Sequence, residues 1–80
     1  MFHRVKEVKA LPDFCLQVHF LNDVSKIYDV KMLIDKYPAF SVFRDVPDEF
    51  VSVQTDVGGY GVVWNDDLDI SCDELWENGK

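Results

Sequence analysis

The sequence predicts an α+β domain with a mostly antiparallel sheet of about five strands, short internal helices and a C-terminal helix. Three observations predict this class: short stretches with alternating apolar residues, turn residues between them, and a helix-capping pattern near the C-terminus. The expected order is three strands, short helices, two strands and a helix. Since no long crossover helix separates the strands, we expect two hairpins, with the short helices on one face of the sheet. The 80 residues are expected to form one domain, residues 1–80.

The first half of the chain predicts an N-terminal strand and a hairpin. The N-terminal strand is expected over residues 4–11, with either a bulge or an edge position, because its valines break strict alternation and its lysines suit an edge. The clearest alternation runs over residues 14–20, where Phe14, Leu16, Val18 and Phe20 share one face. A turn at residues 22–23 then leads into a strand over about residues 24–28.

The middle of the chain predicts short helical segments. Asp29 is placed to cap a helix of about two turns over residues 30–36, which Pro38 ends. Phe40 and Phe43 are spaced to fill the core from the next segment. Residues 47–50 begin with proline and carry acids, as in a single helical turn. Alternation then predicts a strand over residues 51–55.

The last third of the chain carries the strongest local signals. Gly58 and Gly59 accept positive φ and predict a turn. The following strand ends at Trp64, and Asn65-Asp66-Asp67 is expected to form an acidic loop. Ser71 and Glu74 have the spacing of a capping box, which predicts a helix from Cys72 to about Asn78.

Charge is distributed unevenly along the chain. The net charge is −7, and residues 44–80 contain ten acidic residues but only two basic ones. Such a surface repels phosphate, so we expect neither direct nucleic-acid binding nor binding to an anionic membrane. A small basic protein is the expected partner, because opposite charge steers association. The sequence leaves the oligomeric state open between a monomer and a weak homodimer.

The termini and cysteines bear on location. The chain has no apolar run long enough to span a membrane, and charges interrupt its start where a signal peptide is apolar. We therefore expect a cytoplasmic protein. In that compartment Cys15 and Cys72 are expected to be free thiols. Cys72 lies at the start of a helix, but the adjacent Asp73 and Glu74 oppose thiolate formation.

No pattern in the sequence predicts a catalytic, cofactor or metal site. His19 has no visible partner, and it lies roughly 13 Å along the strand from Cys15, too far to share a metal ion. The acids at 66, 67 and 69 fail the calcium-loop pattern in either register. The glycines at 58, 59 and 61 precede a strand and no lysine follows, unlike a phosphate-binding loop. We therefore expect a protein that is not an enzyme.

Several aromatic and acidic residues are candidates for binding. Tyr60 and Trp64 either contribute to the core or line a small-ligand pocket. Trp76 either packs on the sheet or belongs to a contact surface, where tryptophan is enriched. The predicted interaction surface combines the acidic loop with the last helix, and its residues are Asp66, Asp67, Asp69, Asp73 and Trp76.

A set of short stretches over nearly the whole chain matches the pattern of a known family. They are Val5, Val8, the run 16–20, Tyr28-Asp29-Val30 before Leu33, residues 40–50, the run 61–65, the run 68–71 and the run 73–76. On these residues the chain resembles a small bacterial family, domain of unknown function 2442. The last stretch is the most specific part of the resemblance, while the loop after Trp64 lacks the Pro-x-Gly turn of many relatives and reads Asn65-Asp66-Asp67 instead.

The resemblance implies a compact α+β domain without an established activity, so no functional residues carry over to this chain. Some larger members append a helix-turn-helix domain, which suggests regulation. Small members are often encoded beside a protein of a second uncharacterised family, 4160, in an arrangement similar to toxin–antitoxin pairs. The leading hypothesis is a non-enzymatic protein-interaction module, the antitoxin-like half of a two-protein module. The alternative is a small-ligand-binding or regulatory domain.

Overall fold

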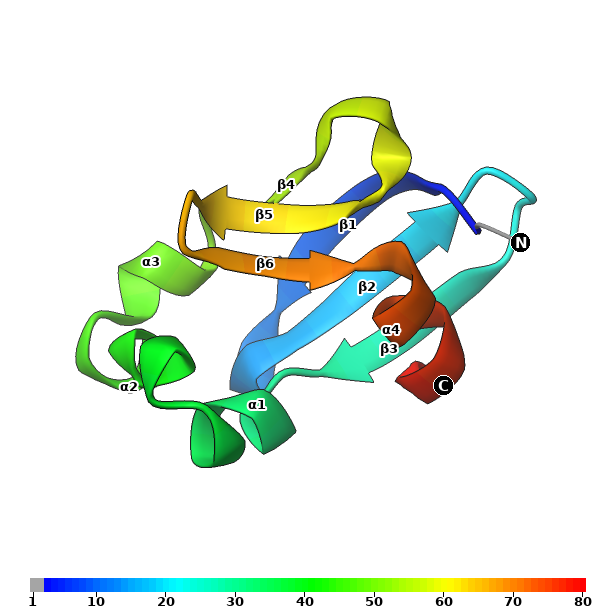
Figure 1. Ribbon diagram of the computed structural model, residues 1–80. Coiled ribbons are helices and arrows are strands. Elements are labelled where there is room, and N and C mark those ends of the chain that lie inside the picture. The colour runs from blue at the N-terminus through cyan, green and yellow to red at the C-terminus, as the bar shows by residue number, and fades with distance from the viewer. Residues whose placement is uncertain (1–2) are drawn as a thin grey trace.

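The computed structural model describes residues 3–80 and contains two three-stranded antiparallel sheets, not one sheet of five strands. Sheet A has the order β1-β2-β3, and sheet B has the order β4-β5-β6. Sheet B lies across sheet A, and the short helices gather at one end of the molecule (Figure 1). The elements are β1 (Val5–Leu11), η1 (Pro12–Phe14), β2 (Cys15–Phe20), β3 (Ser25–Asp29), α1 (Lys31–Lys36), η2 (Pro38–Ser41), α2 (Val42–Asp45), α3 (Pro47–Phe50), β4 (Gln54–Thr55), η3 (Val57–Gly59), β5 (Gly61–Asn65), β6 (Leu68–Ser71) and α4 (Cys72–Asn78).

The strand β6 is the main difference from the sequence-based expectation. Asn65 does end β5, but Asp66 and Asp67 form a tight turn instead of a loop that leads into the helix. The Asn65 side-chain oxygen accepts a hydrogen bond of 2.8 Å from the Asp67 backbone N–H, which stabilises this turn. Leu68 and Ile70 then face the core and complete a hairpin with β5. Since β6 runs directly into α4, the helix-capping pattern at Ser71 overlaps the short alternation of Leu68–Ser71, and the sequence did not predict this strand.

Further strand boundaries also differ from the prediction. Phe14 was expected in β2, but it has a φ of 56° and belongs to η1, so β2 begins at Cys15. The strand expected over residues 51–55 shrinks to Gln54–Thr55, because residues 51 and 52 continue the turn after α3. Of the two alternatives for β1, a bulge is present as a register shift between Val5 and Glu7, and β1 is also an outer strand of sheet A.

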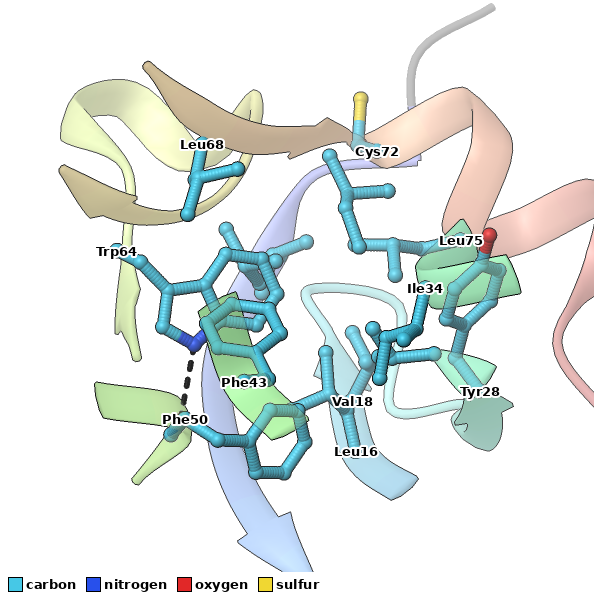
Figure 2. Packing of buried hydrophobic residues seen from close by; sticks show 14 of the residues in the cluster. Leu16, Val18, Tyr28, Ile34, Phe43, Phe50, Trp64, Leu68, Cys72 and Leu75 are labelled. Carbon is cyan, nitrogen blue, oxygen red and sulfur yellow. Dashed lines mark hydrogen bonds between the residues drawn. The ribbon is translucent and has the colours of Figure 1, made fainter. Parts of the chain in front are cut away.

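The core lies between the two sheets and the helices (Figure 2). The alternation predicted for β2 is confirmed, because Leu16, Val18 and Phe20 have no exposed surface. From the opposite side, Trp64 packs against Phe43 and Phe50, and its indole N–H donates a hydrogen bond of 2.9 Å to the Phe50 carbonyl. Burial of these large rings supplies most of the stabilisation in a core this small.

Helix α4 begins and ends at the residues that the sequence predicts. The Ser71 hydroxyl oxygen accepts a hydrogen bond of 3.2 Å from the Glu74 backbone N–H, as expected for an N-cap. The second half of the capping box does not form, because the Glu74 carboxylate accepts hydrogen bonds from Tyr28 and Asn78 instead. At the other end, Gly79 donates its backbone N–H to the Leu75 carbonyl. Within residues 3–80, none of the helices has both the length and the apolar character needed to cross a bilayer.

Candidate interaction surface

The four predicted aspartates follow one another along the β5–β6 hairpin and the start of α4. Asp66 and Asp67 form the hairpin tip, Asp69 points outward from β6, and Asp73 lies in the first turn of α4. All four are exposed. The tip and the helix start lie at opposite ends of β6 (Figure 1), roughly 13 Å apart for a four-residue strand. We call these four residues the acidic surface; they form a line of charge along an edge, not a compact pocket.

The carboxylates of the acidic surface form no ion pairs within the described chain, unlike several carboxylates elsewhere in it. The salt bridges within residues 3–80 join His19 to Asp23, Lys31 to Asp13 and Asp29, and Arg44 to Asp35. None of them includes a residue of the acidic surface. From residue 54 to the end, the chain has seven acidic residues and one lysine. The four carboxylates of the acidic surface therefore have no ion-pair partner within the described part of the chain.

Trp76 lies apart from the four aspartates, on the side of α4 that faces sheet A. Its ring stacks on His3 with centroids 3.7 Å apart and meets Phe20 edge-on at 5.0 Å. The Lys26 ammonium lies 4.2 Å from the ring centroid and donates a hydrogen bond of 2.6 Å to the Trp76 carbonyl. These contacts hold the ring half-buried, so Trp76 anchors α4 on sheet A, and of the predicted surface residues it alone belongs to a packed aromatic cluster.

Tyr60 and Trp64, which were predicted either to contribute to the core or to line a ligand pocket, differ in their burial. Trp64 is buried in the core, with 9% of its surface exposed. Tyr60 is 45% exposed, and its hydroxyl accepts a hydrogen bond of 3.0 Å from the Arg4 guanidinium. The same guanidinium lies over the Tyr60 ring at 5.1 Å. Trp64 therefore acts as a core residue, and the two rings face different surroundings.

A hollow that the sequence does not reveal lies between α1 and α4. Its volume is about 410 Å³, and its walls come from Met32, Leu33, Lys36, Tyr37, Glu74 and Asn78. A neighbouring hollow of about 320 Å³ shares Met32 and Asn78 and extends to Ile27. Met32 and Tyr37 are 43% and 46% exposed, so the hollow has an apolar surface that water reaches. Periodicity alone gave no signal, because the two walls come from elements far apart in sequence, α1 and α4.

His19 has partners that the sequence did not show. Its Nδ1 atom lies 2.8 Å from the Ser25 hydroxyl oxygen, and its Nε2 atom lies 3.6 Å from an oxygen of Asp23. The ring stands on the outer face of sheet A beside a shallow hollow of about 120 Å³. The Asp23 side chain is 85% exposed, so its contact with His19 is open to water. In these surroundings the contacts hold the hairpin turn between β2 and β3.

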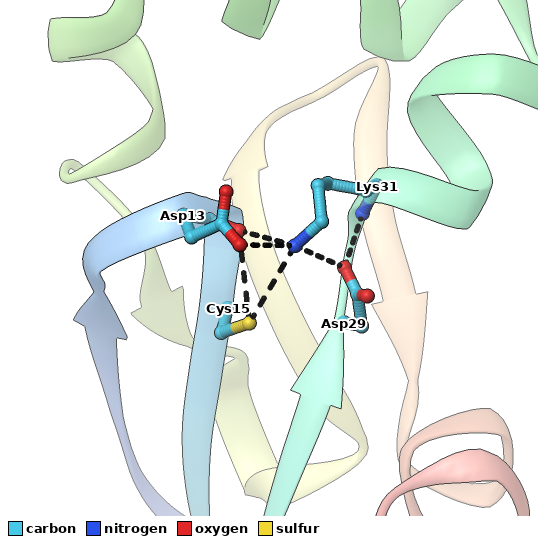
Figure 3. A network of polar contacts seen from close by, with 4 residues as sticks. All are labelled: Asp13, Cys15, Asp29 and Lys31. Atoms are coloured by element: carbon cyan, nitrogen blue, oxygen red, sulfur yellow. Dashed lines mark hydrogen bonds and ion pairs between the residues drawn. The ribbon is translucent and has the colours of Figure 1, made fainter.

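The two cysteines are free thiols in different surroundings. Cys72 is buried, and burial, followed by the charge of Asp73, raises the pKa of its thiol. Cys15 lies at the edge of a polar network around Lys31 (Figure 3). The Lys31 ammonium is 3.0 Å from the Asp13 carboxylate, 3.1 Å from Asp29 and 4.0 Å from the Cys15 sulfur.

This network fastens the start of α1 to sheet A. Burial disfavours the ionised Asp29, but hydrogen bonds from the backbone N–H and the ammonium of Lys31 outweigh it and lower the pKa of this carboxyl. Hydrogen bonds to Asp13 and Asp29 raise the pKa of Lys31. Asp29 was predicted as the N-cap of α1, but the N-cap is the next residue, Val30. The Asp29 side chain still supports the start of the helix, because it accepts a hydrogen bond of 2.9 Å from the Lys31 backbone N–H.

The side chains that commonly bind metal ions are dispersed in the described part of the chain. Within residues 3–80, no group of three or more histidine, cysteine, aspartate or glutamate side chains is arranged to bind a metal ion. Cys15 and His19 stand at opposite ends of β2, paired with Asp29 and Ser25 respectively.

Comparison with known proteins gives a family but no characterised relative. No curated protein and no solved structure matches this chain. The model of one protein family, described as "Protein of unknown function (DUF2442)", matches residues 5–80. That range includes every strand and helix that the structure describes. The chain therefore belongs to the DUF2442 family of proteins of unknown function.

Proposed function

We propose that this protein is a non-enzymatic interaction module that binds a small basic protein through its acidic surface, as the antitoxin-like half of a two-protein module. The observation that carries the proposal is the segregation of charge. The carboxylates of Asp66, Asp67, Asp69 and Asp73 have no cationic partner among residues 3–80, whereas those of Asp13, Asp29 and Asp35 do. The expected site of action is the cytoplasm.

A line of unpaired carboxylates favours a cationic partner for two physical reasons. Mutual repulsion between the aspartates is relieved when lysine or arginine side chains approach them. The summed field also accelerates the encounter with a basic protein and fixes its orientation. The same field repels nucleic-acid phosphates and anionic headgroups, so a protein is the favoured partner.

Affinity purification of the tagged protein from its source organism tests the proposal. At low salt, a small basic protein is expected to co-purify in stoichiometric amount and to be released as the salt concentration rises, because added ions screen exposed charges. Mass spectrometry identifies it. An eluate without such a protein contradicts the proposal.

A matched pair of variants locates the binding surface. The first replaces Asp66, Asp67, Asp69 and Asp73 by asparagine and is expected to lose the partner. The second removes four exposed charges elsewhere, with Glu7→Gln, Asp23→Asn, Asp45→Asn and Asp48→Asn, and is expected to retain it. Both variants change the net charge equally, so similar loss in both would show that net charge and not the acidic surface determines binding.

The hollow between α1 and α4 supports a second candidate function, the binding of a small apolar ligand. Its apolar wall contains Met32, Leu33 and Tyr37, and Glu74 and Asn78 supply polar groups that could orient a ligand. A small-molecule screen by NMR, with the Met32 methyl signal as reporter, tests it. A ligand that shifts this signal, and that binds less tightly to Met32→Lys, would support the candidate.

A further inference from the structure

Strand β6 presents a free edge whose hydrogen-bonding direction the structure fixes. The Cys72 backbone N–H donates a hydrogen bond of 2.8 Å to the Tyr60 carbonyl. In an antiparallel ladder, hydrogen-bonded pairs alternate with pairs that are not hydrogen-bonded. Gly61 with Ser71 and Val63 with Asp69 are therefore the second kind of pair. Asp69 and Ser71 consequently direct their backbone N–H and carbonyl groups away from β5.

The other outer strands of the two sheets have neighbouring segments of the chain. At β3, Ile27 exchanges two backbone hydrogen bonds with Lys80, of 3.1 and 2.9 Å. Strand β1 lies beside the two-residue strand β4 (Figure 1). Ser71 is the N-cap of α4, so its carbonyl accepts the first hydrogen bond of that helix. The N–H and carbonyl of Asp69 and the N–H of Ser71 have no backbone partner among the turn, loop and cap contacts of the described residues, and both residues are exposed.

We propose that a basic, extended segment of a partner protein binds at this edge as a fourth strand of sheet B, next to β6. The inference rests on the proposed function, because it assigns a binding mode to the partner of the acidic surface. An added strand pairs with the backbone N–H and carbonyl of Asp69 and with the backbone N–H of Ser71. Its outward side chains then lie beside the Asp69 carboxylate, with Asp67 and Asp73 at the two ends.

The negative charge along β6 determines which kind of strand can bind at its edge. A second copy of this chain, paired through β6 about a two-fold axis, would bring the aspartates of both copies together along the new ladder. Like charges on neighbouring strands are destabilising, and charged residues on short edge strands prevent self-association. Lysine or arginine residues at alternate positions of a partner strand instead make favourable cross-strand pairs. A basic strand therefore fits this edge and a second β6 does not.

Hydrogen exchange with a defined peptide tests the binding mode on the unchanged protein. The probe is a capped six-residue peptide of alternating lysine and valine, with three residues of each kind. Two isomers carry N-methyl groups on either all the lysines or all the valines. In a bound strand, only one of these two sets of N–H groups faces β6, the lysines if the strand is antiparallel and the valines if it is parallel.

The expected result has two parts. The unmodified peptide slows exchange of the Asp69 and Ser71 amides, and one N-methylated isomer binds at least about tenfold more weakly than the other, because its methyl groups face β6, remove the hydrogen bond to the Asp69 carbonyl and obstruct close approach of the strand. Equal affinity of the two isomers, no binding of the unmodified peptide, or binding that leaves both amides unprotected would overturn the inference. Salt-sensitive binding without protection would leave the acidic surface as the binding site and refute only strand addition.

Discussion

The hydroxyl of Tyr28 donates a hydrogen bond of 2.8 Å to the carboxylate of Glu74, and this contact joins β3 of sheet A to α4 across 46 residues of sequence. The same carboxylate oxygen accepts a hydrogen bond of 2.8 Å from the Asn78 side chain. The Tyr28 ring is fully buried, so its hydroxyl depends on Glu74 for a partner. The contact also explains why Glu74 does not complete the capping box with Ser71.

The Tyr28–Glu74 contact predicts a loss of stability at alkaline pH. Burial, and then the hydrogen bond and charge of Glu74, raises the pKa of Tyr28 well above its usual 10.0. Above about pH 10 the unfolded state therefore releases a proton that the folded state retains, and the free energy of unfolding falls as the pH rises further. The stabilisation is fully present below that pH.

Urea unfolding at about pH 9 and about pH 11, for the native protein and Tyr28→Phe, measures this effect. The lysines titrate in both proteins, so the difference between the two isolates Tyr28. We expect the native protein to lose more stability than the variant over this interval. Equal losses would show that Tyr28 ionises as readily in the folded state as in the unfolded state.

The Asp29–Lys31 contact predicts a loss of stability at acidic pH. Burial opposes ionisation of Asp29, but hydrogen bonds from Lys31 hold its pKa below the usual 3.8. The contact therefore stabilises the fold fully above about pH 4, and the stabilisation disappears as the pH falls through the lower pKa of the folded state. Asp29→Asn is expected to lose less stability than the native protein between about pH 5 and about pH 2.

The control for this prediction is Asp66→Asn, which removes an exposed charge outside the Lys31 network. Its acid unfolding curve is expected to follow that of the native protein more closely than the Asp29→Asn curve does. If Asp29→Asn instead loses as much stability as the native protein on acidification, then Lys31 does not favour the ionised Asp29 in solution.

The Trp64 indole predicts a large cost for a conservative substitution. Trp64→Phe removes the N–H donor to the Phe50 carbonyl and leaves a void beside Phe43. We expect a loss of about 2–3 kcal/mol in the free energy of unfolding, from the unpaired carbonyl and the lost packing. The half-buried Trp76 provides the comparison, and Trp76→Phe is expected to cost about 1 kcal/mol. Chemical denaturation followed by circular dichroism measures both, and a smaller cost at position 64 would contradict the prediction.

Local signals predicted much of the fold. The alternation over β2, the glycine turn at Gly58 and Gly59, and the boundaries of α4 each depend on neighbouring residues, and each was confirmed. The division into two sheets was not predicted, because it depends on which strands pair across the chain. The residues Leu68–Ser71 show the difficulty: four residues give too short an alternation, and the stronger capping pattern at Ser71 overlaps it.

Only part of the candidate site could be predicted from the sequence, because several of its features arise from tertiary packing. Exposure of Asp66, Asp67, Asp69 and Asp73 follows from their charge, whereas the position of Trp76 depends on His3 and Lys26, more than 45 residues away in sequence. The hollow between α1 and α4 and the contact of His19 with Ser25 likewise arise from tertiary packing. The free edge of β6 could not be recognised before β6 itself was.

Asp69 is expected to keep the β6 edge from pairing with itself, and its replacement tests that role. Asp69→Thr retains the outward backbone groups, introduces a residue that favours strands, and removes the charge that repels a second β6. We expect its average mass in sedimentation experiments to rise above that of the native protein at concentrations on the order of 100 µM, because uncharged edges associate. Asp66→Thr at the hairpin tip removes an equal charge without changing the edge, so it should sediment like the native protein. Equal association of the two variants would mean that net charge alone opposes self-association, whereas a rise confined to Asp69→Thr would show that the edge itself is competent to accept a strand.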